Sequence, residues 1–457
     1  MLPRRMALPS RKLVLGQIAL GSPAVGPDGS HALYTRRIAR AQGYRRHIWI
    51  APLEGGRVRA LTVGDVRDSA PRLTPKGDRA LFLRDKQVWA VPLEGGEAEQ
   101  ITARPHGVSA FAPAPRGGRL ALAAAAPEAR FLVGRSRGGA APVARAIARA
   151  DWRLDGEGYL DRHTHLYVQE SRAGARPRRL TRGDWSVEDF SWSPDAKRIA
   201  FCAERGERGD IAAAPAVHAV SVGGGEPALL ARLAGSCSGV SWSPDGRHVA
   251  FLGIDEEGEP YGCEHSLWVV PAQGGAPRDL AAGRYLHLHP TLASDLVDWE
   301  AGAGEGLAWE RPEAVISALT LAGRTSLWRF PLEGEPEEIA GCGPHVHGYA
   351  YGGGRIVTLR AAAGCAVELH VEREPRGRRR LTRDGTAWQR PLAGIACEDV
   401  SVPGRAGSIR ATLVSPRGAG RKRLPLVLSI IGGPGSSWGP EPWLPDWALA
   451  AAGARVL

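Results

Sequence analysis

Apolar and polar positions alternate along this chain in a pattern that recurs over most of its length. The clearest copies are SWSPDAKRIAF, which starts at Ser191, and SWSPDGRHVAF, which starts at Ser241. Proline presets φ for a turn, aspartate caps it, and glycine suits the position where φ is positive. Apolar residues then alternate with others, as at Ile199 and Phe201, which is the pattern of a half-buried strand.

A second element completes each repeat. A strand that carries an aromatic residue runs into a glycine-rich turn, as in HIWIAPLEGG and SLWVVPAQGG, and a short apolar closure follows. Four short strands per unit are typical of propeller blades, because radial repetition hides the sheet edges. The closures occur at Leu61-Thr62, Ile101-Thr102, Leu180-Thr181, Leu229-Leu230, Leu280-Ala281, Ile339-Ala340 and Leu381-Thr382.

These seven closures predict a mainly β protein with a seven-bladed propeller over residues 20–385. The third unit carries an insertion from Pro127 to Asp161. The sixth unit, from about Leu288, lacks a clean SPDG turn. Large aromatic residues at strand centres bury well, so six tryptophans are expected to pack between blades: Trp49, Trp89, Trp192, Trp242, Trp268 and Trp328.

The last seventy residues follow a different pattern. Leu424 to Ile431 is a continuous apolar run, which predicts a strand buried on both faces. A turn follows in which backbone N–H groups can approach a ligand closely. A helix is predicted from Asp446 to Ala452, with Gly453 as its stop and a strand after it. This order of elements builds one side of the oxyanion hole in α/β-hydrolases, so residues 386–457 are predicted to begin such a domain.

The formal net charge of +11 comes almost entirely from arginine. Two basic clusters, Arg376 to Arg380 and Arg421 to Arg423, stand beside turn residues and are expected to be solvated loops. Nucleic-acid binding needs cations gathered on one face, so no nucleic-acid partner is expected. No run of eighteen apolar residues exists, so no membrane span is expected. Six scattered cysteines without a CxxC pair suit a reducing compartment, and a cytoplasmic location is expected.

Taken together, the SWSPDG-type repeats and the segment PLVLSIIGGPGSSWG resemble the prolyl oligopeptidase (S9) family of serine peptidases. The acylaminoacyl-peptidase and dipeptidyl-aminopeptidase branch is the more similar one. The resemblance implies a WD40-like or TolB-like propeller that precedes an α/β-hydrolase domain and restricts entry to short peptides. It implies hydrolysis through a serine ester, with no cofactor and no metal. The stretch Ala396 to Pro416 looks like the first hairpin of that hydrolase domain.

Carried over residue by residue, Gly432, Gly433 and Pro434 match the oxyanion loop of the family. Ile431 stands where the family has His or Tyr, and its side chain cannot donate a hydrogen bond. Loss of one oxyanion donor typically costs about 10²–10³ in rate. The family's Ser, Asp and His lie further along than position 457. We therefore expect this chain to hold an incomplete catalytic domain, to contain no catalytic residue, and to be inactive as it stands.

Two residues match a nucleophile pattern but are not expected to act as nucleophiles. Ser437 fits the pattern G-x-S-x-G, but Asp446 follows it without any histidine, and a nucleophile elbow needs both partners. Cys237 occupies the central place in a similar pattern that leads into a strand, so a structural role is expected. The competing hypothesis is a non-catalytic propeller that binds peptides or proteins. A strand with few neighbours is poorly covered, so the region after Trp388 is expected to be the least ordered.

No metal site is expected in this sequence. Residues two apart on a strand share a face, so three His-x-His pairs could each hold a metal. None has a third ligand at a suitable spacing, and packing roles are expected instead. The stretch Asp155 to Asp161 lacks the EF-hand pattern and fits the insertion of the third unit, which the resemblance implies can face the central cavity. The pairs are His163/His165, His287/His289 and His345/His347.

Overall fold

The structure of the 457-residue chain is a computed structural model. It describes residues 15–134, 144–155, 157–207, 209–212, 214–257, 265–284, 288, 292–293, 297–298, 300–301, 304, 306–321, 323–340, 345–361, 365–373, 377–386, 392–405, 407–430, 437–438 and 443–457. Strands dominate this part of the chain, as the sequence predicts. None of its helices is long and apolar enough to cross a membrane.

The described residues form seven four-stranded antiparallel sheets that follow one another along the chain. The first three are β1 (Ile18–Val25), β2 (His31–Arg40), β3 (Gly43–Pro52) and β4 (Arg59–Ala60); β5 (Ser69–Leu73), β6 (Arg79–Arg84), β7 (Gln87–Pro92) and β8 (Glu99–Gln100); and β9 (Val108–Pro113), β10 (Arg119–Ala125), β15 (Thr164–Glu170) and β16 (Arg178–Arg179).

The next two sheets are β17 (Phe190–Trp192), β18 (Arg198–Ala203), β19 (Ala216–Ser221) and β20 (Ala228–Ala231), and then β21 (Cys237–Trp242), β22 (His248–Gly253), β23 (Ser266–Pro271) and β24 (Arg278–Asp279). The last two are β26 (Leu307–Arg311), β27 (Ala314–Leu321), β28 (Arg324–Pro331) and β29 (Glu337–Ala340), and then β30 (His345–Gly352), β31 (Arg355–Ala361), β32 (Glu368–Arg373) and β33 (Gly377–Arg380). The short helix α2 (Gly209–Ala212) lies within the fourth sheet's β18–β19 connection.

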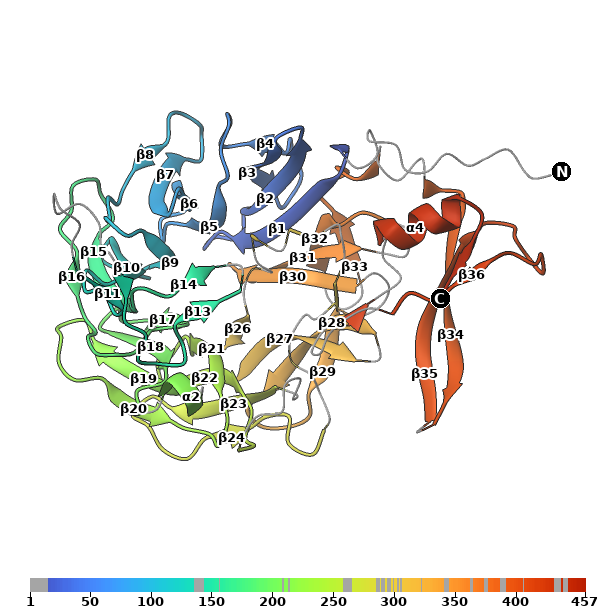
Figure 1. Ribbon diagram of the computed structural model, residues 1–457. Helices are drawn as coiled ribbons and strands as arrows, with labels where there is room; N and C mark the ends of the chain where they lie inside the picture. Colours follow the sequence, from blue (N-terminus) through green and yellow to red (C-terminus); the bar gives the residue numbers. More distant parts are fainter. Residues whose placement is uncertain are drawn as a thin grey trace.

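The sheets are arranged around a common centre, with the first strand of each sheet innermost (Figure 1). Innermost strands contact one another in order, including β1 with β5, β21 with β26, and β26 with β30. The last innermost strand, β30, also contacts β1. Among the described strands, each sheet contains strands of its own repeat only. The first and last sheets therefore meet without a strand shared between them.

The turn between the first two strands of a sheet has the predicted chemistry. The Asp195 carboxylate accepts hydrogen bonds from the Ser193 hydroxyl (2.6 Å) and the Lys197 amide (3.0 Å). Asp245 repeats this arrangement in the fifth sheet. The residue after each aspartate has positive φ, +73° at Gly246 and +57° at Ala196. The turn thus imposes the left-handed conformation even where alanine replaces glycine.

Two of the seven predicted apolar closures lie in fourth strands, Leu229-Leu230 in β20 and Ile339-Ala340 in β29. The other five follow the fourth strands directly. The amide of Ile101 donates to the carbonyl of Val88 (2.8 Å), and the amide of Val88 donates to the Thr102 hydroxyl (2.9 Å). The same pair of bonds links Leu61 and Thr62 to Ile48. It recurs at Thr181 and Thr382. Each of these four closures fixes the outer edge of its sheet to the third strand.

The cores lie between neighbouring sheets, and the six tryptophans contact them as predicted. Trp192 packs with Ala121 of the third sheet and Phe201 of the fourth, and its indole N–H donates to the Ala112 carbonyl (3.1 Å). Trp242 is likewise buried. The remaining four, Trp49, Trp89, Trp268 and Trp328, are only half-buried at the edges of such clusters.

Three details of the sequence prediction are wrong. The sixth sheet starts at Leu307 and not near Leu288. Arg378 to Arg380 belong to strand β33, where they pair with β32, so they are not a loop. The run predicted as a strand buried on both faces contains β36 (Leu426–Val427), which pairs in parallel with β38 on one side. Leu426, Leu428 and Ile430 are 62%, 64% and 85% exposed, because β36 is the edge strand of its sheet and, among the described strands, pairs with β38 alone.

The C-terminal part forms its own four-stranded sheet in the order β34-β35-β38-β36. The hairpin of β34 (Ile395–Gly404) and β35 (Gly407–Pro416) confirms the predicted one. Strands β36 and β38 (Arg455–Val456) are parallel, and α4 (Leu444–Ala451) lies between them in the sequence. The helix starts two residues earlier than predicted, since a proline occupies its first turn. Gly453, at φ +99°, follows its end.

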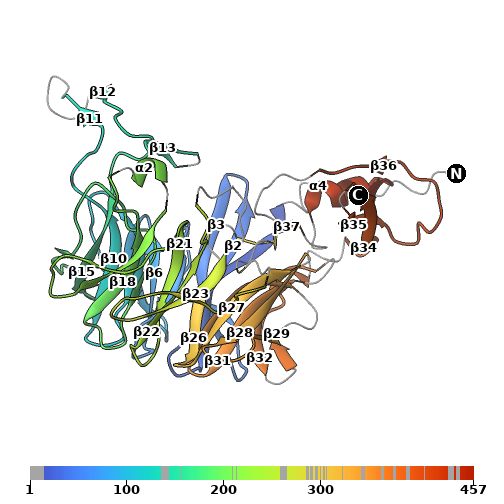
Figure 2. The ribbon, with the colours of Figure 1, turned by 90° about the horizontal axis from the view of Figure 1, so that it is seen from below.

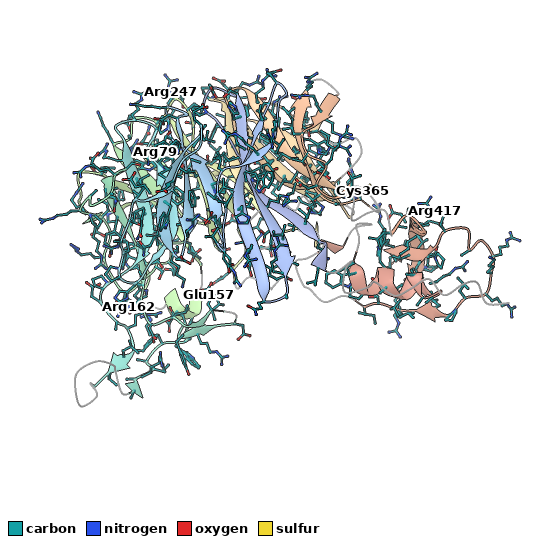
Figure 3. The ribbon with its side chains drawn as sticks, turned by 90° about the horizontal axis from the view of Figure 1, so that it is seen from above. Arg79, Glu157, Arg162, Arg247, Cys365 and Arg417 are labelled. Atoms are coloured by element: carbon teal, nitrogen blue, oxygen red, sulfur yellow. The ribbon has the colours of Figure 1, made fainter. Side chains whose placement is uncertain are left out.

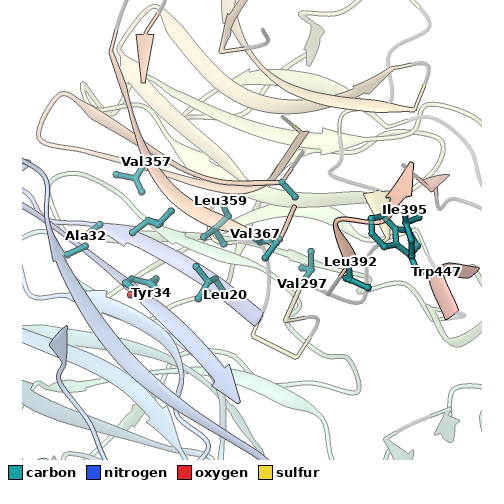
Figure 4. Close-up of a cluster of buried hydrophobic side chains, with 14 of the residues drawn as sticks. Leu20, Ala32, Tyr34, Val297, Val357, Leu359, Val367, Leu392, Ile395 and Trp447 are labelled. Atoms are coloured by element: carbon teal, nitrogen blue, oxygen red, sulfur yellow. The ribbon is translucent and has the colours of Figure 1, made fainter. Parts of the chain in front are cut away.

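One apolar cluster joins the first sheet, the last sheet and the C-terminal part, and we call it the seam cluster. Figure 4 shows Tyr34 and Leu20 beside Leu359, and Val297 beside Leu392. Trp447 and Val456 are 1% exposed within it. The prediction that the region after Trp388 is the least ordered stays a prediction, although residues of α4 and β38 belong to this buried cluster. The described members are Leu20, Ala32, Tyr34, Ala51, Leu53, Val297, Val357, Leu359, Ala361, Ala366, Val367, Leu369, Val371, Leu392, Ile395, Val414, Trp447, Ala450, Ala451 and Val456.

The third sheet carries the predicted insertion, which projects from one face of the ring (Figure 2). It contains two hairpins, β11 (Leu132–Val133) with β12 (Ala144–Arg145) and β13 (Arg153–Leu154) with β14 (Gly158–Tyr159). Two ion pairs fix them, Arg130 with Asp151 (2.7 Å) and Arg145 with Asp161 (2.6 Å). The stretch Asp155 to Asp161 thus belongs to a hairpin.

The threonine closures generate a stability prediction. In Thr102→Val the buried amide of Val88 loses its hydroxyl partner, and an unsatisfied buried donor costs about 1–3 kcal/mol. Thr102→Ser keeps the hydroxyl and is the matched control. Urea unfolding followed by tryptophan fluorescence should place the valine variant clearly below the serine variant. Equal midpoints for the two would show that the hydroxyl does not hold the closure.

Candidate functional site

The predicted oxyanion loop, Ile431, Gly432, Gly433 and Pro434, lies outside the described residues. The chain on both sides of it is described. The Ser429 amide donates to the Leu457 carbonyl (2.8 Å), so parallel pairing extends beyond β36. Asp446, in the first turn of α4, hydrogen-bonds the Ser429 side chain, and burial raises the pKa of its carboxyl. The strand before the loop and the helix after it are thereby fixed to each other.

Ser437 does not occupy a nucleophile elbow. Its backbone is extended in β37 (Ser437–Trp438), which pairs in parallel with β25 (Leu292–Ala293). An elbow needs a sharp turn from strand into helix at the serine, whereas α4 starts only at Leu444. Cys237, the other residue that matches a nucleophile pattern, opens strand β21 and is 1% exposed. Its buried place agrees with the structural role predicted for it.

The histidine pairs have ordinary partners where the structure describes them. His163 bonds Asp184 through Nε2 (2.7 Å) and Ser186 through Nδ1 (3.1 Å). Burial lowers the pKa of His165 to about 4, with the charge of Arg179 adding to the effect. His345 and His347 lie on β30, and His287 and His289 are outside the described residues. Within the described part of the chain, no group of three or more His, Cys, Asp or Glu side chains could hold a metal.

Sequence reasoning missed a cavity of about 660 Å³ beneath the insertion. Its walls come from the β13–β14 hairpin and from the second and third sheets, and Figure 3 labels Glu157 and Arg162 there. Loss of contact with water lowers the pKa of His106, and the charges of Arg162 and Arg104 lower it further. The charged and titratable side chains of the wall are Arg67, Asp85, Lys86, His106, Glu157, Tyr159, Asp161 and Arg162.

A second cavity, of about 500 Å³, lies at the centre of the ring and was also missed. Its lining includes Arg72, Phe111, Glu188, Asp189 and Trp192, from strands of different sheets or the residues just before them. Surrounding protein atoms and the charges of Asp189 and Glu204 raise the pKa of Glu188 to about 7. Water still reaches the side chain through the channel. The only sequence signal was an acidic pair just before a first strand, at Glu188-Asp189.

Comparisons with solved structures identify the fold of this chain. No family model matches the sequence, and no curated protein matches it. Solved structures do match: the chain has the fold of S9 serine peptidases, at low sequence identity. Likeness at this level of identity establishes the fold and not the activity.

Among the solved structures, an acylaminoacyl peptidase from Pyrococcus horikoshii is similar with a TM-score of 0.75 and 17% identity over 97% of this chain. A puromycin-hydrolyzing peptidase from Mycobacterium tuberculosis is similar with a TM-score of 0.71 and 14% identity over 99% of the chain. The chain spans 65% of the first protein's length and 67% of the second's. The β-propeller domain of the Trilobed protease from Pyrococcus furiosus matches over 80% of this chain, with a TM-score of 0.53.

Glu188 generates a pH-dependent prediction. Its folded pKa of about 7 lies above the ordinary 4.5, so the folded protein binds the extra proton between these values. Stability therefore falls as pH rises from about 4.5 to 7, and Glu188→Gln should remove that fall. From pH 5 to pH 8, the melting temperature of the variant should rise relative to that of the unmodified protein.

The exposed Glu94→Gln is the control for this experiment, since Glu94 lies in an outer turn. Water access in the channel reduces the expected size of the effect, so the sign of the trend is the observable. The compared quantity is the melting temperature of Glu188→Gln minus that of the unmodified protein. If this difference stays constant or falls as pH rises, the raised pKa of Glu188 is contradicted.

Proposed function

We propose that these 457 residues are the propeller and the first part of the α/β-hydrolase domain of an S9-type serine peptidase that acts on short peptides. Residues 20–385 are the propeller, with seven blades, and residues 386–457 begin the catalytic domain. Ile431, Gly432, Gly433 and Pro434 form the oxyanion loop. Residues 386–457 contain no histidine, so this part of the catalytic domain cannot supply a Ser-Asp-His set and the polypeptide alone does not cleave peptides.

One observation carries the proposal: the structural likeness extends past the seven sheets into the C-terminal part. The propeller domain of the Trilobed protease matches 80% of this chain, whereas the peptidases match 97–99%. The matching region then includes the parallel unit of β36, α4 and β38. A strand, a glycine loop, a helix and a parallel strand are the elements that supply one side of an oxyanion hole in α/β-hydrolases.

The geometry of the ring suits short peptides as ligands. The insertion and the C-terminal part lie toward the same face of the ring in Figures 2 and 3. The cavity under the insertion and the central cavity both have polar and charged linings, which can pair with the termini and amides of a peptide. The same cavities leave a second candidate, a peptide- or protein-binding propeller without catalysis.

The reading frame downstream of codon 457 separates these two functions. The peptidase proposal predicts a G-x-S-x-G elbow there, followed by an aspartate and then a histidine. A stop codon directly after Leu457 in the native gene, with no such set in a neighbouring frame, would favour the binding module instead.

Inactivity of the 457-residue polypeptide has its own test. Treated with a fluorophosphonate, it should show no stoichiometric labelling, because Ser437 sits in an extended strand without a histidine after it in the chain. Mass spectrometry of tryptic peptides locates any adduct, and a chymotrypsin sample treated in parallel checks the reagent. Full labelling at Ser437 that is lost on heat denaturation would overturn the prediction that Ser437 is not a nucleophile.

A further inference from the structure

The ring closes at the junction between its first and last sheets. In the described strands no sheet combines β1–β4 with β30–β33, so no ladder of backbone hydrogen bonds closes the ring there. The two sheets touch through side chains of the seam cluster. A few contacts supplement it at the rim, such as the ion pair of Arg36 with Asp384 (2.8 Å).

A segment from elsewhere in the chain lies against both sides of this junction. The connection between the fifth and sixth sheets includes described residues from Leu292 to Gly304, and we call these residues the strap. Val297 forms a parallel bridge with Leu20 of β1, and Gly304 forms one with Tyr349 of β30. The strap therefore bonds the innermost strand of the first sheet and the innermost strand of the last.

A buried ion pair anchors the strap to the first sheet. Asp298 is fully buried. Its carboxylate accepts two bonds from the Arg46 guanidinium, at 2.5 and 2.9 Å, and Arg37 lies 3.6 Å away. Arg46 also bonds Glu300 (2.7 Å). A bidentate pair of this kind fixes geometry strongly, and removing one partner leaves the other charge buried and uncompensated.

The first sheet is shaped to receive the strap. A β-carbon at Gly21 would lie 2.9 Å from the β-carbon of Ala301, so only glycine permits this approach. The register of β1 shifts between Gly21 and Ala24. Ser22, inside that bulge, has φ +43°, and its hydroxyl donates to the Ala301 carbonyl. Bulges and positive φ at a non-glycine residue cost free energy, so they mark a position that the surrounding packing imposes.

The strap also reaches the C-terminal part. Its residues Leu292 and Ala293 pair in parallel with Ser437 and Trp438. Val297 lies within the seam cluster, beside Leu392 and near Ile395 and Trp447 in Figure 4. One segment thus contacts the first sheet, the last sheet, and the strand that follows the predicted oxyanion loop.

We infer that the strap is an internal clasp that closes the ring at its junction and holds the C-terminal part in place, with Asp298 as the residue that positions it. Its closing role stands on the contacts alone. Only its bearing on the loop Gly432–Pro434 rests on the proposed function. In that setting the clasp transmits any opening of the ring to the oxyanion side of the catalytic domain.

Hydrogen–deuterium exchange on the full 457-residue chain tests the clasp in two variants of different chemistry. Asp298→Asn removes the anchor charge, and Gly21→Ala displaces the strap by contact. Each should accelerate amide exchange by about tenfold or more in β1, β30 and residues 426–457. The third to fifth sheets should keep their exchange rates.

Asp68→Asn is the matched control, because Asp68 is also fully buried and makes a bidentate pair with Arg84 of the second sheet (2.7 and 2.8 Å). Its backbone amide donates to the Arg46 carbonyl (3.0 Å), a bond that asparagine keeps. It should not accelerate exchange in residues 426–457. The inference is wrong if both test variants affect only residues 292–304, if they loosen all seven sheets equally, or if Asp68→Asn gives the same pattern. None of these readouts involves peptidase activity, so the proposed function can fail while the clasp holds.

Discussion

Closure of a ring without a shared strand is the constraint on which this structure depends. Among the described strands, each of the seven sheets uses only strands of its own repeat, so packing holds the junction between the first and last sheets. The seam cluster supplies that packing through Leu20 and Tyr34 on one side and Val357 and Leu359 on the other. Burying apolar side chains contributes about 25 cal/mol per Å², without the directionality of a backbone ladder.

The same cluster ties the C-terminal part to the ring. Leu392 and Trp447 extend it beyond the propeller, so α4 and β38 are covered even though β36 remains largely exposed. This explains why burial differs within the C-terminal part. Its helix is buried on one face, while Leu428 and Ile430 have no neighbour among the described residues that covers them. The strap runs between these two bodies, and its buried Asp298–Arg46 pair gives the apolar contact a defined position.

Much of the fold could be predicted from the sequence because the repeats encode local chemistry. The Ser-Pro-Asp turn specifies its own hydrogen bonds, and the tryptophan strands specify which face packs between sheets. Those signals are short-range. The start of the sixth sheet was misplaced because its turn at Pro312 lacks aspartate and glycine. The burial of Leu426 to Ile430 was overestimated because apolar composition does not reveal which strands lie alongside.

The candidate site was less accessible to sequence reasoning, for a physical reason. The two cavities assemble charged residues from separate repeats, such as Arg72, Glu188 and the insertion residue Glu157, and no local motif marks them. Arg46 lies in the first sheet and Asp298 follows the fifth, so no periodic pattern in the sequence links these two residues. The glycine loop, by contrast, is predicted from the order of a strand, glycines, a helix and a strand, and it stays a prediction because Ile431 to Pro434 lie outside the described residues.

The central claim is that the ring junction and the C-terminal part share one core. The most direct test truncates that core on the ring side and measures the other side: Leu20→Ala, followed by hydrogen–deuterium exchange of α4. The buried Leu122→Ala of the third sheet, which lies in a different cluster, serves as reference. The account predicts that α4 exchanges faster in Leu20→Ala and is unchanged in Leu122→Ala. Unchanged exchange of α4 in Leu20→Ala, with loosening confined to β1, would contradict a shared core.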